Sequence, residues 1–515
     1  MKSAYWMSML LLICHHAAAS HILMITLGGT RSHKVPFIAL GQGLVSRGHN
    51  VTLLSAFPSG TNNPPPGPHV VEITPPTLVE AVEGFSHMDP LGKKLKGQSA
   101  YSVLDVFNFA YKICDAFFTS TETQQLLSTK VDLLILDGAF PECLIGLSVH
   151  FHCPFVFLNT VAFHTIQFSL SGNPVLPSVT PFLDSPYSDR MDLWERTING
   201  VYHIAGQAIS VILNKVFVEP VVRRHLGTNI PPNSLVGRNV SLILQNGHHT
   251  ITYPRPFLPG VVETACIHCT APQPLSQELE EFVRGGASKG FIYVSFGTSL
   301  RSAQVPPQLR QLIVNVLGTL QHQVLWKYEN NNETLELPPN VRISNWFPQQ
   351  DLLGHPMIVG FVNHGGLHGL MEAVYHEVPM VLLPIFCDHS ANSRKAKDDG
   401  YAEILEWQNL TEEVLRSTII KVVTDKRYKE RVRHRSVLLK DQPESPLLRA
   451  LYWVEYVLRH KGAPHLQSPA KDLSVTQYYM LDSLAVLGVL IYCGVKLTQA
   501  TATIFTRKPA KFKLN

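Results

Sequence analysis

A histidine and two glycines stand at the centre of FVNHGGLHGLMEAVYHEVP (361–379), where an apolar run typical of a strand changes into a run with helical spacing. This change places Gly365 and Gly366 near the N-terminus of the expected helix. Free N–H groups and the positive end of the helix dipole bind anions at such a turn, and glycine lets a phosphate approach the backbone closely. The stretch alone leaves open a second interpretation, in which the glycines only make a tight turn.

Polar or aromatic residues follow four of the strands expected in the second half of the chain. In open parallel sheets, ligands bind at the carboxyl ends of the strands. A hydroxyl, an aromatic ring, an anion-binding turn and a polar pair at these ends together predict a site for a nucleotide diphosphate that carries a hydroxylated group. The four strand ends are Gly297-Thr298, 346–351, 364–366 and Asp388-His389.

Apolar runs typical of strands alternate with amphipathic helical runs, beginning with HILMITL (21–27) and NVTLLS (50–55). This alternation predicts an α/β fold with parallel sheets that are covered on both faces. It pauses at YPRPFLPGV (253–261), whose prolines indicate a linker, and resumes with GFIYVSFG (290–297). We therefore expect two doubly wound, Rossmann-like domains that face each other across a cleft.

The length of 515 residues exceeds that of one ordinary hydrophobic core, and 45% hydrophobic with 16% charged residues is typical of a globular protein. The formal net charge is +4, and the C-terminal tail holds four basic residues and no acidic one. The remainder of the chain is therefore close to neutral, which argues against nucleic acid as a partner. The basic residues of the tail are Arg507, Lys508, Lys511 and Lys513.

Both ends of the chain indicate a membrane protein of the secretory pathway. An apolar run followed by AAAS predicts a signal peptide over residues 1–20, and 478–497 is long enough to span a bilayer. A buried helix of a soluble protein is the alternative for the second run, because Asp482 raises the cost of insertion. The basic tail, 498–515, is expected in the cytosol. Its KFKLN end resembles the dilysine signal for retrieval to the endoplasmic reticulum.

These features predict a single-pass type I protein of the endoplasmic reticulum membrane with luminal domains. Luminal exposure makes the sequons at Asn50, Asn239, Asn332 and Asn409 candidates for glycosylation. Six cysteines remain outside the signal peptide and the span, and the sequence leaves their pairing open. One CxxC pair, at 266 and 269, has no second pair at the spacing that zinc requires.

The segment WFPQQDLLGHPMIVGFVNHGGLHGLMEAVYHEVPMVLLPIFCDHSANSRKAKDDG (346–400) closely resembles the nucleotide-sugar signature of the UDP-glycosyltransferases, the family that includes the UDP-glucuronosyltransferases. The resemblance covers nearly the whole chain, including SHKVPFIALGQGLVSRGHNVTLLS and LDGAFPEC before the signature and WVEYVLRHKGAPHL after it. It implies the GT-B fold. The expected parts are a signal peptide (1–20), an acceptor-binding domain (21–252), a UDP-sugar-binding domain (253–440), a helical segment (441–477), a transmembrane helix (478–497) and a cytosolic tail (498–515).

The resemblance also implies roles for residues of the second domain. Trp346 resembles the residue whose ring stacks on uracil, with Gln349 beside it, and Glu372 resembles the residue that holds the ribose hydroxyls. The predicted diphosphate contacts are Thr298, His364, Gly365, Gly366 and His368, and the predicted sugar contacts are Asp388 and His389. A histidine, backbone amides and a helix dipole stabilise a leaving diphosphate without a metal, so we predict no metal ion and no cofactor besides the UDP-sugar co-substrate.

The catalytic base is expected in the first domain. His33 resembles the family's histidine that takes a proton from the acceptor hydroxyl, and Asp137 resembles the carboxylate that orients its imidazole. The pair is chemically suitable, because a neutral histidine is a competent base near pH 7 and an aspartate fixes its tautomer. Attack on the anomeric carbon from the side opposite the UDP implies inversion.

Several positions depart from the family pattern. Asn363 replaces a threonine before the glycine turn, His368 replaces an asparagine near the diphosphate, and Glu377, which we expect to be exposed, replaces a glycine. His389 replaces a glutamine, and histidine occurs at this position in family members that use UDP-galactose. Because imidazole and amide groups present different geometry to sugar hydroxyls, the donor sugar stays open among glucose, glucuronate and galactose.

The acceptor pocket is expected within residues 60–190, where apolar and aromatic stripes suit a small lipophilic phenol, steroid, xenobiotic or lipid alcohol. Such stripes are also typical of ordinary core. The predicted function is inverting transfer of a hexosyl or glucuronosyl group from a UDP-sugar to a hydroxyl of this acceptor, as in detoxification. The alternative is a catalytically impaired lipid- or hormone-binding relative, and a homo-oligomer is left open.

Overall fold

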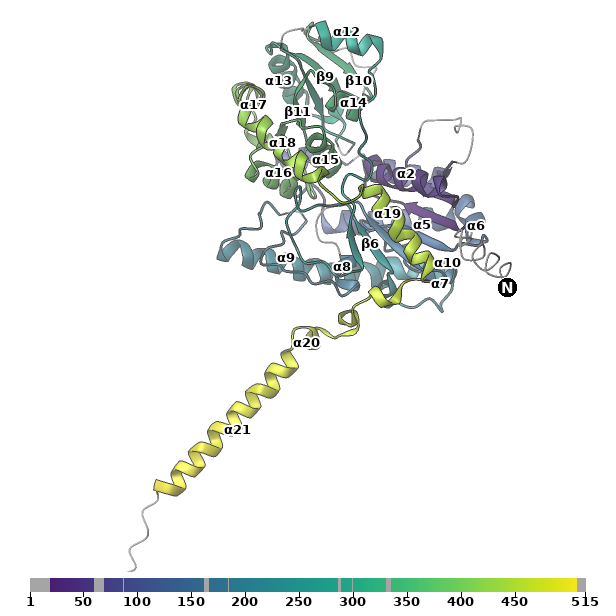
Figure 1. Cartoon of the computed structure of the whole chain (residues 1–515), viewed down its shortest axis with the longest axis vertical. Helices are drawn as coiled ribbons and strands as arrows, with labels where there is room; N and C mark the ends of the chain where they lie inside the picture. The colour runs from purple at the N-terminus through teal and green to yellow at the C-terminus, as the bar shows by residue number, and fades with distance from the viewer. Residues whose placement is uncertain are drawn as a thin grey trace, which may run out of the picture.

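The computed structural model describes residues 19–59, 69–86, 88–161, 166–183, 185–285, 289–298, 300–329 and 335–506. Nearly all of the predicted signal peptide, the sequon at Asn332 and the basic residues of the tail lie outside these ranges. Within them the chain forms two lobes and a long C-terminal helix that projects away from both (Figure 1).

The first lobe contains a seven-stranded parallel sheet with the order β3-β2-β1-β4-β5-β6-β7. Its central strands consist almost wholly of buried apolar residues, as a sheet covered on both faces requires. β1 pairs with β2 on one side and β4 on the other, so the order reverses here and opens a crevice at the carboxyl ends. The strands are β1 (His21–Thr26), β2 (Asn50–Ser55), β3 (Val71–Ile73), β4 (Leu133–Asp137), β5 (Phe155–Asn159), β6 (Leu242–Gln245) and β7 (Val261–Glu263).

The second lobe contains a six-stranded parallel sheet with the order β10-β9-β8-β11-β12-β13. Its order reverses between β8 and β11, which pair directly. The strands are β8 (Phe291–Ser295), β9 (Gln323–Lys327), β10 (Val341–Ser344), β11 (Ile358–Asn363), β12 (Met380–Leu382) and β13 (Ala402–Ile404). Two doubly wound sheets confirm the fold class predicted from the alternating pattern.

Helices connect the strands on both faces of each sheet (Figure 1). In the first lobe the longer ones are α2 (Arg31–Ser46), α3 (Pro76–Ser86), α5 (Val103–Thr119) and α9 (Leu193–Ile212), which continues through a π-helical turn (Leu213–Val218) into α10 (Glu219–Leu226). Shorter ones are α4 (Pro90–Leu95), α6 (Thr121–Leu127), α7 (Leu147–His150), α8 (Ile166–Leu170) and α11 (Asn233–Val236). In the second lobe they are α12 (Gln277–Gly285), α13 (Pro307–Gly318), α14 (Gln349–Leu353), α15 (Leu367–Tyr375), α16 (His389–Asp398), α17 (Glu412–Thr424) and α18 (Lys426–Lys440).

The chain returns to the first domain after the second. Helix α19 (Pro446–Arg459) places Ala450, Leu451 and Val454 in the same core cluster as Phe37 of α2. Strand β7, which pairs with β6, also lies beyond the domain boundary expected at residue 252. The prolines of the linker do not indicate that β7 belongs to the first sheet, because the pairing of β6 with β7 is a tertiary contact.

The C-terminal helix α21 (Leu481–Thr506) is long and apolar enough to cross a membrane, and it begins after the short helix α20 (Val475–Tyr478). It starts three residues later than the predicted span and continues nine residues beyond its end. The backbone break falls at Met480, whose φ is 55°. A second stretch, 193–226, also has the length and composition of a span.

One disulfide, Cys114–Cys143, joins α5 to the loop after β4. It resolves one of the pairings that the sequence left open. The other cysteines of the described residues are not disulfide-bonded.

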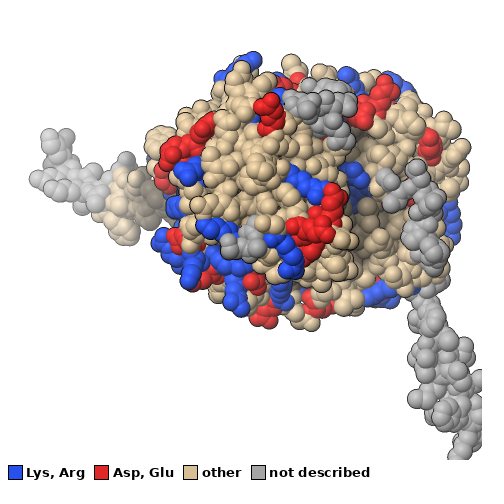
Figure 2. All heavy atoms as spheres, turned by 90° about the horizontal axis from the view of Figure 1, so that it is seen from above, with Lys and Arg blue, Asp and Glu red and all other residues tan. Residues whose placement is uncertain are grey.

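On the face in Figure 2, acidic and basic side chains are interspersed.

Candidate active site

His33 lies in the first turn of α2, directly after the carboxyl end of β1. Its Nδ1 lies 3.2 Å from Oδ2 of Asp137, the last residue of β4, and 2.7 Å from Oγ1 of Thr160, which follows β5. The adjacency of β1, β4 and β5 therefore assembles these three side chains at one edge of the sheet.

Asp137 is fully buried and accepts hydrogen bonds from four groups of the chain. Thr160 Oγ1 and the backbone N–H of Ala139 donate to Oδ1, both at 2.9 Å. Thr26 Oγ1 donates to Oδ2 at 2.9 Å, beside the contact from His33. These four contacts hold the buried carboxylate in one orientation.

The hydrogen bonds assign the tautomer of His33. Thr160 has one hydroxyl proton, which it donates to Asp137, so Nδ1 of His33 must supply the proton for its own contacts with Thr160 and Asp137. Nε2 then has a lone pair. The His33 side chain is 14% exposed, so the ring is partly open to solvent.

His368 of α15 meets this cluster from the second domain. Its ring centroid lies 6.4 Å from that of His33, and its Nε2 accepts a hydrogen bond from Nδ2 of Asn246 at 3.1 Å. Burial lowers the pKa of His368 well below the ordinary value, and the neighbouring His268 and His33 add to the effect. The neutral His368 thus lies at the contact between the two domains, at the start of α15 and next to the carboxyl edge of the first sheet.

His364 follows β11 and is packed between two glycines. A Cβ on Gly297 would lie 2.3 Å from the His364 ring, and a Cβ on Gly366 would lie 2.4 Å from it. Burial and the charge of Lys327 lower the pKa of His364 to about 3, so the ring is neutral near pH 7. Its Nδ1 is buried and has no hydrogen-bond partner among the described residues.

The glycine turn before α15 is shaped by its neighbours. Gly365 has a φ of 82°, and its N–H donates to Oδ1 of Asn363 at 2.6 Å. Asn392 donates to the carbonyl of Gly365 at 3.1 Å. Thr298 has a buried Oγ1 with no partner in the described part of the chain. Unpaired buried donors beside a helix N-terminus form an environment suited to an anion.

Asp388 and His389 stand at the start of α16. Asp388 accepts a hydrogen bond from Asn392 at 3.0 Å, and burial raises its pKa. The rings of His389 and His364 lie edge to face at 4.5 Å. Burial lowers the pKa of His389 well below the ordinary value, and the neighbouring His364 and Lys94 add to the effect. The two predicted sugar contacts therefore adjoin the predicted diphosphate contacts.

The residues predicted to bind the nucleoside form another group in the second domain, beside the predicted diphosphate and sugar contacts. Trp346 is 57% exposed, with the Arg31 guanidinium carbon 5.0 Å from its ring centroid. Both oxygens of Glu372 are occupied by the chain, since Gln349 Nε2 donates to Oε2 at 2.6 Å and His268 Nε2 contacts Oε1 at 3.2 Å.

One expectation about the departures is wrong. Glu377 was expected to be exposed, yet it is half-buried at the end of α15 and its φ is 64°. A left-handed backbone favours glycine, which explains why glycine is usual there.

Sequence reasoning missed Thr26, Thr160, His268 and Asn246. Thr26 and Thr160 stand at strand ends, which was the available signal, but their shared contact with Asp137 depends on strand order. His268 lies within the CxxC stretch, which drew attention only as a metal motif. Among the described residues, no group of three or more His, Cys, Asp or Glu side chains is arranged to hold a metal ion.

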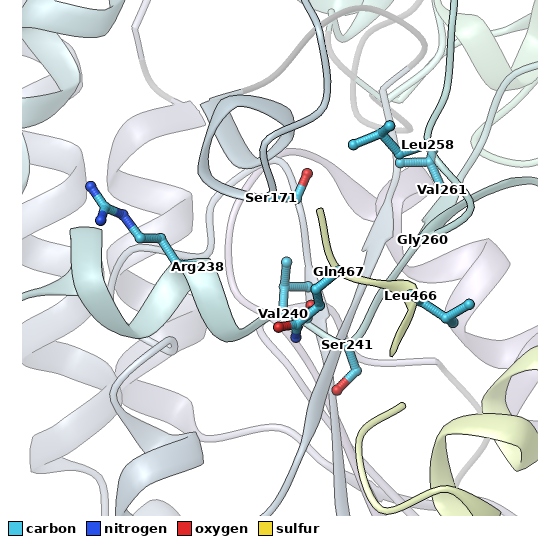
Figure 3. Close-up of a pocket in the computed structure, with 9 residues that line it drawn as sticks. All are labelled: Ser171, Arg238, Val240, Ser241, Leu258, Gly260, Val261, Leu466 and Gln467. Atoms are coloured by element: carbon cyan, nitrogen blue, oxygen red, sulfur yellow. The ribbon is translucent and has the colours of Figure 1, made fainter. Parts of the chain in front are cut away.

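A small pocket lies apart from these residues, where the segment after α19 returns to the first domain (Figure 3). None of the predicted site residues lines it, and it has room for little more than water. Its lining residues are Ser171, Arg238, Val240, Ser241, Leu258, Gly260, Val261, Leu466 and Gln467.

Residues 69–512 match the family model described as "UDP-glucoronosyl and UDP-glucosyl transferase". The chain belongs to the UDP-glycosyltransferase family. This UDP-glycosyltransferase is 31% identical to UDP-glucosyltransferase 2 of Dactylopius coccus over 88% of the chain and 87% of that relative. It is 30% identical to human UDP-glucuronosyltransferase 2B15 over 99% of the chain and 98% of that relative.

Solved glycosyltransferase structures share the fold of this UDP-glycosyltransferase. The glycosyltransferase VinC, solved in complex with dTDP, aligns with a TM-score of 0.55 at 16% identity, covering 85% of this chain and 100% of that one. The calicheamicin glycosyltransferase CalG4 aligns with a TM-score of 0.54 at 16% identity, covering 86% and 99%. The two domains form a GT-B fold, and the enzyme transfers a sugar from a UDP-sugar to an acceptor.

Proposed function

We propose that the enzyme transfers a hexosyl or glucuronosyl group, with inversion, to a hydroxyl of a small lipophilic acceptor, and that His33 is the base. Nε2 of His33 takes the hydroxyl proton as the oxygen forms a bond to the anomeric carbon. The bond from that carbon to the β-phosphate oxygen breaks, and UDP leaves with the electron pair. The observation that supports this mechanism best is the Nδ1–H tautomer of His33, held by Asp137 and Thr160.

The UDP diphosphate would lie against the glycine turn, where Thr298 and His364 each have a buried polar atom with no hydrogen-bond partner among the described residues. Neutral donors there stabilise the leaving group without a metal ion, and the helix dipole of α15 adds to them. His368, whose ring centroid lies 6.4 Å from that of His33, would lie near the reacting atoms. Trp346 would stack on uracil, Glu372 with Gln349 would hold the ribose, and Asp388 with His389 would hold the sugar.

The acceptor would enter from the first domain. Phe140 lies 6.4 Å from His33 between ring centroids and is followed by Phe109, which stacks edge to face on it at 6.0 Å. Aromatic walls beside a base suit a lipophilic phenol, steroid, xenobiotic or lipid alcohol, as in detoxification.

The enzyme would be anchored in the endoplasmic reticulum membrane by α21, with both catalytic domains in the lumen and a short basic tail in the cytosol. The exposed sequons at Asn50, Asn239 and Asn409 support luminal glycosylation.

The test is UDP release by microsomes that contain the chain, with UDP-glucose, UDP-glucuronate or UDP-galactose and a mixture of phenolic and steroidal acceptors. Release should disappear in His33→Ala and persist in His460→Ala, which changes an exposed histidine directly after α19. Analysis of the anomeric configuration of the product checks inversion. Saturable UDP binding without release for any donor would favour the catalytically impaired binding relative.

A further inference from the structure

Helix α9 has its polar side chains inside and its apolar side chains outside. Asn199, His203 and Ser210 are buried, whereas large apolar side chains on the other faces are exposed to solvent. Trp194 and Ile204 are each 72% exposed. The other exposed members of this apolar face are Leu193, Ile198, Val201, Tyr202, Val211, Ile212 and, in the turn after α9, Val216.

The buried side of α9 is fixed by hydrogen bonds to the loop that precedes it. Asn199 Nδ2 donates to the carbonyls of Pro177 and Thr180 at 2.7 and 2.8 Å, and its Oδ1 accepts from Phe182 N at 2.8 Å. His203 Nε2 contacts the Thr180 carbonyl at 3.0 Å. The helix cannot turn its apolar face inward without breaking these buried bonds.

Composition alone would allow this helix to cross a bilayer. Between Arg196 and Lys215 the sequence has no Asp, Glu, Lys or Arg over residues 197–214. A spanning helix, however, would have to carry its bonded polar side and the attached loop into hydrocarbon. A helix with one bonded polar face and one apolar face fits the plane of the membrane interface, where Trp194 at its start is also favoured.

The start of the membrane anchor lies beside α9. Gln207 of α9 donates to Ser169 Oγ of α8 at 3.2 Å. Three residues after Ser169, Gly172 packs so closely on the backbone of Lys471 that a Cβ there would lie 2.6 Å from Lys471 N. Lys471 precedes α21 by only ten residues, and Figure 1 places α9 on the part of the first domain from which α20 and α21 leave.

We propose that α9 lies flat in the surface of the membrane that α21 crosses, with Trp194, Ile204 and Val211 facing the lipid. This inference rests on the membrane anchoring given under Proposed function, but not on the catalytic roles. The occupant of the apolar face is lipid rather than a second copy of the chain, because the short connection from Lys471 to α21 keeps this face near the bilayer.

The experiment uses the full chain, one copy per nanodisc, with phospholipids brominated either near the headgroup or near the bilayer centre. Bromine near the headgroup should quench the emission of Trp194, and bromine at the centre should not. The quenched emission should be lost in Trp194→Phe and retained in Trp346→Phe, whose indole is also exposed but lies in the second domain.

A second pair of variants tests the face itself. Ile204→Glu should reduce the quenching of Trp194, whereas Val437→Glu, at an exposed valine of α18, should not. The Trp194 measurement stands by itself if Ile204→Glu does not fold.

Two quenching results would overturn the inference. Quenching only by bromine at the bilayer centre would mean that the helix crosses the membrane. Absence of quenching would mean that lipid does not cover this face. If Trp194 is instead shielded from solvent only in discs that hold two copies, the face belongs to a dimer interface. A chain that does not enter nanodiscs would overturn the anchoring and this inference together, whereas UDP release is measured separately.

Discussion

At the carboxyl edge of the first sheet, Asp137 accepts four hydrogen bonds from the chain. At the same edge of the second sheet, Thr298 and His364 each have a buried polar atom without a partner among the described residues. Two sheets of the same architecture thus differ at their carboxyl edges. In the first, the hydrogen bonds of Asp137 are supplied by the chain, and in the second, Thr298 and His364 have hydrogen-bonding capacity left over.

The difference fits two different tasks. A base must keep one tautomer and orientation through the reaction, so its partners belong to the chain. A donor site must exchange a diphosphate with water, so part of its hydrogen-bonding capacity is left for the ligand at some cost to the stability of the free protein. The first edge should therefore be sensitive in kcat, and the second in donor binding.

The largest expected effect is at Asp137. Asp137→Asn places an amide among four donors, so the Nδ1–H tautomer of His33 is no longer stabilised and kcat should fall by about 10²–10⁴-fold. Steady-state kinetics and UDP titration should separate this loss from donor binding, which should change little. Asp115→Asn on α5 is the control, and an equal loss of UDP affinity in Asp137→Asn would contradict the division of tasks.

Acid should destabilise the folded protein in part through His364 at the second edge. The pKa of His364 is about 3 in the folded protein and near its ordinary value of 6.5 in the unfolded chain. The unfolded state therefore binds the extra proton between these values, and stability falls as pH decreases below about 6.5. From pH 7 to pH 5 this one group should cost about 2 kcal/mol. Urea unfolding of the solubilised chain should become less acid-sensitive in His364→Gln but not in His460→Gln.

A matched pair of threonines sharpens the comparison. Thr160→Val removes a hydroxyl that contacts both Asp137 and His33, so it should lower stability by roughly 1–3 kcal/mol and also lower kcat. Thr298→Val removes a hydroxyl that has no partner within the described ranges, so stability should hold or rise while the KM for the UDP-sugar increases by about 5–10-fold. The opposite pattern, with Thr298→Val the less stable of the two, would show that the unpaired hydroxyl is structural.

The smallest expected effect lies outside the ligand edge. Glu377→Gly should raise stability by about 1 kcal/mol, because glycine tolerates the φ of 64° that a residue with a Cβ resists. Its 3.9 Å contact with Arg433 is exposed and contributes little. Glu377→Ala keeps the Cβ and should give no gain in thermal unfolding, so an equal gain would assign the effect to charge.

Local sequence patterns were sufficient to predict the strands and helices and to place the site at the carboxyl ends of the strands. Apolar runs of the length of a strand, glycine turns and helical spacing are local patterns, and they located both sheets and the ends where Thr298, His364 and Asp388 stand. The resemblance to a family added the pairing of His33 with Asp137, which lies beyond any local pattern because 104 residues separate them.

Contacts between distant parts of the chain set which polar groups form hydrogen bonds and which apolar surfaces no other part of the protein covers. Thr26 and Thr160 reach Asp137 because β4 pairs with both β1 and β5, and hydrogen bonding between distant strands has no local signature. The exposed apolar face of α9 also has no local signature. Burial depends on what the rest of the chain packs against a helix, so a run of apolar residues does not reveal whether protein covers it.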